Sequence, residues 1–123
     1  MKRAMFGLAG LIGSAALLAT SPVWAHASLV SSNPAANAKV TAAPKTITLT
    51  FSGKVAPAFS KFELVMPEHG GMKVPVKTTV SKDGKSITGT VSTPLTAGAY
   101  KIAWTIASVD GHKMNGEVPF TVG

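Results

Sequence analysis

Two of the three histidines in this chain, His26 and His112, stand where each could bind a metal ion. His26 follows a segment typical of a cleavable secretory signal, and cleavage after Ala25 would leave it with a free α-amine beside its imidazole. Such an amine has a reference pKa of roughly 7.7 to 8.0, so losing its proton costs little near neutral pH. The amine and imidazole of one residue can close a chelate ring around an ion.

The second set of candidate ligands is Asp110-Gly111-His112. Residues two apart in extended backbone project to the same side, so this carboxylate and imidazole can reach one ion. An amine, two imidazoles and a carboxylate suit tetragonal Cu(II), with nickel and zinc bound more weakly. The sequence therefore predicts a Cu(II) site of His26, Asp110 and His112. The alternative stays open: a histidine can simply follow a signal, Asp-Gly is a common turn, and the sequence alone does not bring the two sets together.

The first 25 residues predict a signal peptide. Lys2 and Arg3 precede an apolar run over residues 4–19, and Val23-Trp24-Ala25 suits a cleavage site. The apolar run is shorter than the roughly 20 residues that a spanning helix needs, which disfavours an uncleaved membrane anchor. We expect residues 1–25 to be removed and residues 26–123 to form one domain.

Composition narrows the classes of function. Loss of Lys2 and Arg3 lowers the formal net charge from +7 to +5. The remaining lysines are dispersed, which favours solubility, and without a nucleic-acid motif we expect no nucleic-acid partner. The chain has no cysteine, so a metal must bind through nitrogen, carboxylate or thioether ligands.

The elements that must position these ligands read as short strands separated by turns. Alternating segments predict strands near 27–31 and at 46–51, 62–66, 74–80, 86–91, 99–107 and 118–122, and residues 32–44 are expected to form a surface loop. About seven strands in under a hundred residues predict an all-β, Ig-like or Greek-key β-sandwich.

Four blocks carry a resemblance to a known family: residues 26–35 (HASLVSSNPA), 49–52 (LTFS), 95–104 (LTAGAYKIAW) and 108–112 (SVDGH). In their order and separation the chain resembles CopC-type periplasmic copper-resistance proteins. The resemblance implies a cupredoxin-like or Ig-like barrel with a Cu(II) site of the N-terminal histidine and the Asp-x-His pair. It also implies a periplasmic carrier or buffer that hands copper to a CopD-type inner-membrane transporter. Where some members have a glutamate in the second strand, this chain has Gly53, which puts a ligand from that strand in doubt.

Members of that family that bind Cu(I) carry a methionine-dense loop, because thioethers prefer the monovalent ion. The corresponding loop here keeps only Met66, His69 and Met72. These three residues could form a soft Cu(I) site, with Gly70-Gly71 allowing the loop to wrap. Alternatively, Met66 ends a strand as part of the core and the rest is a loop.

Three functions remain in competition. The first is a monomeric copper carrier with no catalytic step. The second is a copper monooxygenase that uses a histidine brace, which a short domain with few aromatic residues and an acidic Asp110 beside the metal disfavours. The third is an Ig-like structural or adhesion domain that binds no metal. We expect the first, and hence no enzyme activity.

Overall fold

Alternating burial along Thr46–Phe51 agrees with the sequence pattern. The structure is a computed structural model, and the residues it describes are 27–123. Ile47, Leu49 and Phe51 are buried, whereas the threonines between them are half-buried or exposed. This pattern fits a strand with one face on the core and one face toward solvent.

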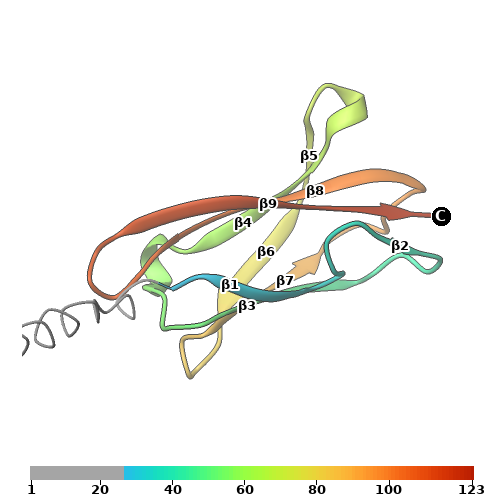
Figure 1. Cartoon of the computed structure of the whole chain (residues 1–123). Helices are drawn as coiled ribbons and strands as arrows, with labels where there is room; N and C mark the ends of the chain where they lie inside the picture. The colour runs from blue at the N-terminus through green and yellow to red at the C-terminus, as the bar shows by residue number, and fades with distance from the viewer. Residues whose placement is uncertain (1–26) are drawn as a thin grey trace, which may run out of the picture.

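Nine strands and two short 3₁₀ helices make up the described part of the chain. In order they are β1 (Leu29–Asn33), β2 (Ala38–Val40), β3 (Thr46–Phe51), η2 (Pro57–Phe59), β4 (Lys61–Met66), η3 (Pro67–His69), β5 (Met72–Val74), β6 (Val76–Val80), β7 (Ser86–Val91), β8 (Gly98–Ala107) and β9 (Lys113–Val122). Figure 1 shows their arrangement, with the β4–β5 hairpin rising above the rest.

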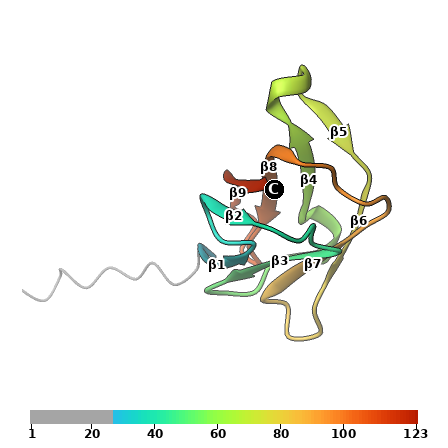
Figure 2. The ribbon, with the colours of Figure 1, turned by 90° about the vertical axis from the view of Figure 1, so that its right-hand side faces the viewer.

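The strands form two sheets packed face to face. One sheet has the order β1-β3-β7-β6, and the other has the order β2-β9-β8-β4-β5. Seen from one end, the sheets form two layers, with β5 and β6 along one side (Figure 2). The predicted all-β sandwich is therefore confirmed.

Two segments differ from the sequence-based prediction in the number of strands they contain. The single strand expected over 74–80 is two strands, β5 and β6, which lie in different sheets. Pro75 separates them, and its missing N–H prevents a continuous ladder. The prediction of a surface loop over residues 32–44 was wrong in part. β1 runs to Asn33, and β2, which lies within this range, pairs in parallel with β9. With β2 and β5 added, residues 27–123 contain nine strands rather than about seven.

Aromatic side chains fill the space between the sheets. Phe51 of one sheet meets Trp104 of the other edge to face, with 5.3 Å between ring centroids. Tyr100 stacks on its cross-strand neighbour Phe120 at 5.5 Å, and its hydroxyl donates a hydrogen bond to the carbonyl of Thr96. Such pairs add to the stability gained by burying their area.

The longest element is the hairpin of β8 and β9, which pair in antiparallel fashion. Gly98 pairs with Val122 at one end of the hairpin, and Ala107 pairs with Lys113 at the other. Its turn lies at the same end of the sandwich as the start of β1 (Figure 1). Within residues 27–123, no helix has the length and apolar character needed to cross a membrane.

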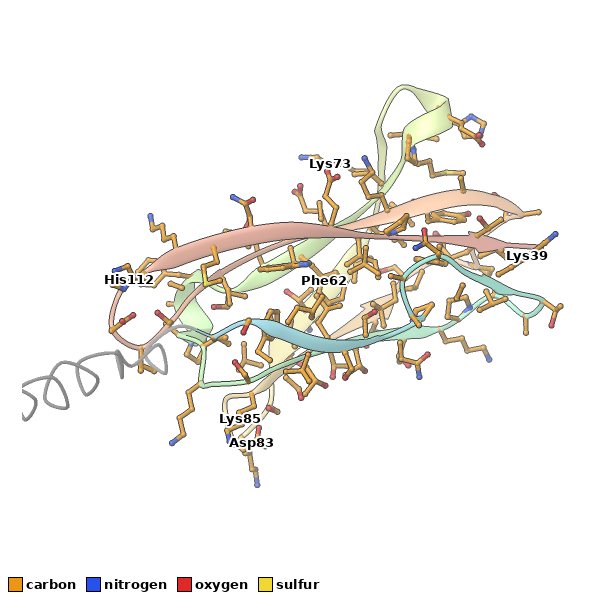
Figure 3. The ribbon with its side chains drawn as sticks, viewed as in Figure 1. Lys39, Phe62, Lys73, Asp83, Lys85 and His112 are labelled. Carbon is orange, nitrogen blue, oxygen red and sulfur yellow. The ribbon has the colours of Figure 1, made fainter. Side chains whose placement is uncertain are left out.

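Gly89 of β7 has no room for a side chain. A Cβ placed there would lie 2.4 Å from Cζ of Phe62, which projects from the opposite sheet into the core (Figure 3). We expect Gly89→Ala to lower the free energy of unfolding by about 1–3 kcal/mol, because neighbouring side chains must leave their preferred rotamers. Urea unfolding of the metal-free protein measures this change.

Gly53→Ala is the matched control, because a Cβ at Gly53 meets nothing closer than 3.8 Å. It should change the free energy of unfolding by no more than about 0.5 kcal/mol. Equal losses in the two variants would contradict the packing described around Gly89.

Candidate metal site

The turn between β8 and β9 carries Asp110 and His112. Ser108 begins it: its N–H donates to the carbonyl of His112 at 2.8 Å, and its own carbonyl accepts from the N–H of Gly111 at 2.9 Å. Gly111 has a φ of +94°, which glycine adopts without strain. The prediction of extended backbone over Asp110–His112 was therefore wrong, since these residues lie in a tight turn.

The turn nevertheless brings the two side chains together. Oδ2 of Asp110 and Nδ1 of His112 form a hydrogen bond of 2.9 Å, and the side chains of Asp110 and His112 are 30% and 61% exposed. Divalent first-row metals bind nitrogen and oxygen at about 2.0–2.2 Å, so two neighbouring ligand atoms at right angles lie about 2.8–3.1 Å apart. The observed separation fits two adjacent ligands of one ion.

Asp110 is held in its ionised form. The hydroxyl of Ser108 donates to its Oδ1, and the N–H of His112 donates to the same oxygen at 3.2 Å. These bonds, the serine hydroxyl above all, hold the pKa of the Asp110 carboxyl well below its usual range. An ionised carboxylate needs no proton loss before it binds a cation.

One loop links this turn to the start of the described chain. Ser52 and Ser28 are joined by two hydrogen bonds that involve main-chain N–H groups, and Ala27 is only 1% exposed. Three residues after Ser52, Val55 forms a bridge with Ser108. The first described residues and the β8–β9 turn thus flank the same short loop.

His26 lies outside the described residues, so its part in the site stays a prediction. Within residues 27–123, no three histidine, aspartate or glutamate side chains come close enough together to hold a metal ion. A metal ion bound by Asp110 and His112 would therefore need further ligands. Figure 3 shows His112 at one end of the molecule and Lys39 at the other.

The three residues of the predicted Cu(I) site lie on the β4–β5 hairpin. Met66 and Met72 are cross-strand partners, and His69 is exposed in η3 between them. Met66 is 7% exposed and belongs to the core, whereas Met72 is 53% exposed. This hairpin is far from the β8–β9 turn, because Val65 pairs with Lys101, some 20 Å along β8 from Ala107.

No role for the side chain of Ser108 was predicted from the sequence. The available signal was its position two residues before Asp110 in a turn, where serine hydroxyls often bond to nearby groups. Its contact with the carboxylate depends on the turn conformation, which the sequence pattern did not predict.

Comparison with known proteins gives consistent matches. The CopC domain matches residues 29–123. Protein YobA of Escherichia coli K12 is 41% identical over 105 residues, which cover 85% of each chain. Copper resistance protein C of Xanthomonas campestris pv. juglandis is 41% identical over 113 residues, or 88% of each chain.

A solved structure agrees with these matches. The crystal structure of PcoC, a methionine-rich copper resistance protein from Escherichia coli, superposes with a TM-score of 0.73 at 38% identity. The similarity covers 80% of this chain and 100% of PcoC.

Proposed function

The chain belongs to the CopC family, and from this premise we propose that it is a periplasmic copper protein that carries or buffers Cu(II). The proposed ligands are the imidazole and α-amine of His26, the carboxylate of Asp110 and the imidazole of His112. The observation that carries the proposal is the 2.9 Å separation between Oδ2 of Asp110 and Nδ1 of His112. Nitrogen and carboxylate ligands together favour Cu(II) over the other divalent ions of its row.

The start of the described chain supports the role of His26. Ala27 is buried against the loop that also bridges to Ser108. Because adjacent Cα atoms are about 3.8 Å apart, a mature chain beginning at His26 would begin beside this loop. A signal peptide of residues 1–25 is part of the proposal, since only its removal creates the free amine.

A carrier must release its ion to a partner. We propose a CopD-type inner-membrane copper transporter as the receiving partner, and a monomer as the state of the protein that delivers copper. The named relatives support carriage rather than catalysis, since two of them are copper resistance proteins. Hydrogen peroxide production by the copper-loaded protein with a reductant would instead favour a monooxygenase.

Copper titration of the secreted protein tests the proposal. Mass spectrometry should first identify His26 as its first residue. Trp104 is then the only tryptophan, and it lies on β8, about 13 Å from Ser108 along the strand. We expect its fluorescence to fall until one equivalent of Cu(II) has been added, and the EPR spectrum to show nitrogen ligands.

Zn(II) is the matched control for the fluorescence, because its filled d shell provides no redox or d–d route for quenching. The fluorescence should stay nearly constant with Zn(II). A correctly processed protein that binds no Cu(II) would rule out the proposed function and favour a metal-free structural domain.

We also propose a separate Cu(I) site on the β4–β5 hairpin, made of Met66, His69 and Met72. The cross-strand pairing of Met66 and Met72 supports it, because directly paired residues project from the same face of a sheet. Thioether ligands favour the monovalent ion. The burial of Met66 means that Cu(I) binding would have to draw its sulfur partly out of the core.

Replacing both methionines tests this second site. We expect Met66→Leu with Met72→Leu to lower Cu(I) affinity by roughly tenfold or more, measured by competition with a colorimetric Cu(I) chelator. Leucine keeps most of the apolar volume at Met66, so the fold should be retained. Met114→Leu is the control, because Met114 lies on β9 and is not part of the β4–β5 hairpin. Unchanged Cu(I) affinity in the double variant would exclude the site.

A further inference from the structure

We propose that Ser108 is a positioning residue of the copper site, whose hydroxyl fixes the Asp110 carboxylate so that one oxygen faces the metal beside His112. The inference rests on the proposed function and names a residue that acts through Asp110 without touching the ion. Its basis is the hydrogen bonding around the β8–β9 turn.

Ser108 is buried although it carries a polar side chain. It is 2% exposed, and among the described residues the other buried polar one is Ser60, at 6%. A buried hydroxyl is costly unless it forms hydrogen bonds. The Ser108 hydroxyl donates to Oδ1 of Asp110, and its oxygen also lies 3.3 Å from the carbonyl oxygen of His112.

The two oxygens of Asp110 have different partners. Oδ1 accepts from the Ser108 hydroxyl and from the N–H of His112, whereas Oδ2 faces Nδ1 of His112. With two donors on Oδ1, the carboxylate has little freedom to rotate. Oδ2, whose hydrogen-bond partner is Nδ1 of His112, is therefore the oxygen that Cu(II) would meet on replacing the proton of that bond. A ligand fixed in advance loses less conformational entropy on binding.

A purely structural role for Ser108 can be separated from a positioning role. The hydrogen bonds by which Ser108 closes the turn use its main-chain N–H and carbonyl, and its bridge to Val55 is also a main-chain pairing. Ser108→Ala retains all of these and removes only the hydroxyl. The change therefore acts mainly on Asp110.

The test is the Cu(II) affinity of Ser108→Ala in the processed protein, measured by competition with a chelator of known affinity. We expect a loss of about tenfold, the lower end of what residues hydrogen-bonded to a metal ligand contribute. Ser108→Thr, which keeps a hydroxyl, should recover most of the affinity. Ser60→Ala is the matched control, because its hydroxyl accepts a bond from the N–H of Ala107 and does not contact Asp110. The control should bind Cu(II) like the unmodified protein.

A double-mutant cycle with Asp110→Asn gives a readout that a structural role would not produce. If Ser108 acts through Asp110, adding Ser108→Ala to Asp110→Asn should cost less than about twofold more. The EPR spectrum of copper-loaded Ser108→Ala should shift toward that of Asp110→Asn. Thermal unfolding of each metal-free variant checks that it is folded at the temperature of the measurement.

Two results would overturn the inference while leaving the proposed function intact. One is an unchanged affinity in Ser108→Ala while Asp110→Asn binds more weakly. The other is full additivity of the two substitutions. If Asp110→Asn and His112→Ala both bind Cu(II) like the unmodified protein, the proposed function fails and this inference fails with it.

Discussion

A protein whose first residue is His26 should bind Cu(II) at least about 100-fold more tightly than the same protein with an acetyl group on the α-amine of His26, a difference of about 2.7 kcal/mol. Acetylation converts the α-amine into an amide and supplies no new amine, which removes one ligand and opens the chelate ring. The other three ligands are the same in both proteins: the imidazole of His26, the carboxylate of Asp110 and the imidazole of His112. Competition with a chelator of known affinity measures the two dissociation constants.

His26→Ala provides the control for this comparison. In that background the imidazole is already missing, and acetylation should reduce the remaining affinity much less than it does at His26. Metal-free unfolding should be the same for the acetylated and unacetylated chains, because the acetyl group removes none of the hydrogen bonds between Ser28 and Ser52. Equal Cu(II) affinities with and without the acetyl group would show that the amine is not a ligand.

Loss of the imidazole at position 112 should have a comparable effect. We expect His112→Ala to weaken Cu(II) binding by about 100-fold and Asp110→Asn by about tenfold, because imidazole is the stronger of the two ligands for Cu(II). His69→Ala is the matched control, since His69 is exposed on η3, far from the β8–β9 turn. An equal loss of Cu(II) affinity in His69→Ala and His112→Ala would contradict the assignment.

The acid dependence of binding should separate the ligands further. The Asp110 pKa is lowered, chiefly by the Ser108 hydroxyl, so this carboxylate stays ionised between pH 7 and pH 5. A depressed pKa affects stability only near and below the unfolded value of about 3.9, where the contribution is lost as the pH falls. Imidazole and amine ligands, by contrast, must release protons to bind the metal. Cu(II) affinity should therefore fall with decreasing pH equally steeply in the unmodified protein and in Asp110→Asn. A clearly shallower fall in Asp110→Asn would contradict this.

Local alternation predicted most of the fold. Thr46–Phe51 and Ser86–Val91 were predicted with their observed bounds, because each alternates along a half-buried surface. β2 was missed because its alternation covers only three residues, too few to stand out in the sequence, and it forms a strand by pairing with β9. β9 begins at Lys113, five residues earlier than predicted, because pairing with β8 orders a polar stretch that looks like a loop in the sequence.

The contact between Asp110 and His112 was predictable from the sequence, but its geometry was not. The pairing of Asp110 with His112 was expected, but for extended backbone, and it arises from a turn that Gly111 permits. The contribution of Ser108 could not be predicted, because it depends on burial and on which carboxylate oxygen accepts which donor. His26 lies outside the described residues, so its role stays a prediction.

The exposure of His112, at 61%, has a kinetic consequence. If Cu(II) binds at the proposed site, an incoming donor atom from a chelator or a receiving protein would reach the ion from solvent and replace one bond at a time. No strand has to separate first, so the exchange rate should follow the concentration of the competing molecule and not the unfolding rate of the sandwich. The proposed carrier would thus combine tight retention of Cu(II) in isolation with rapid delivery to a partner.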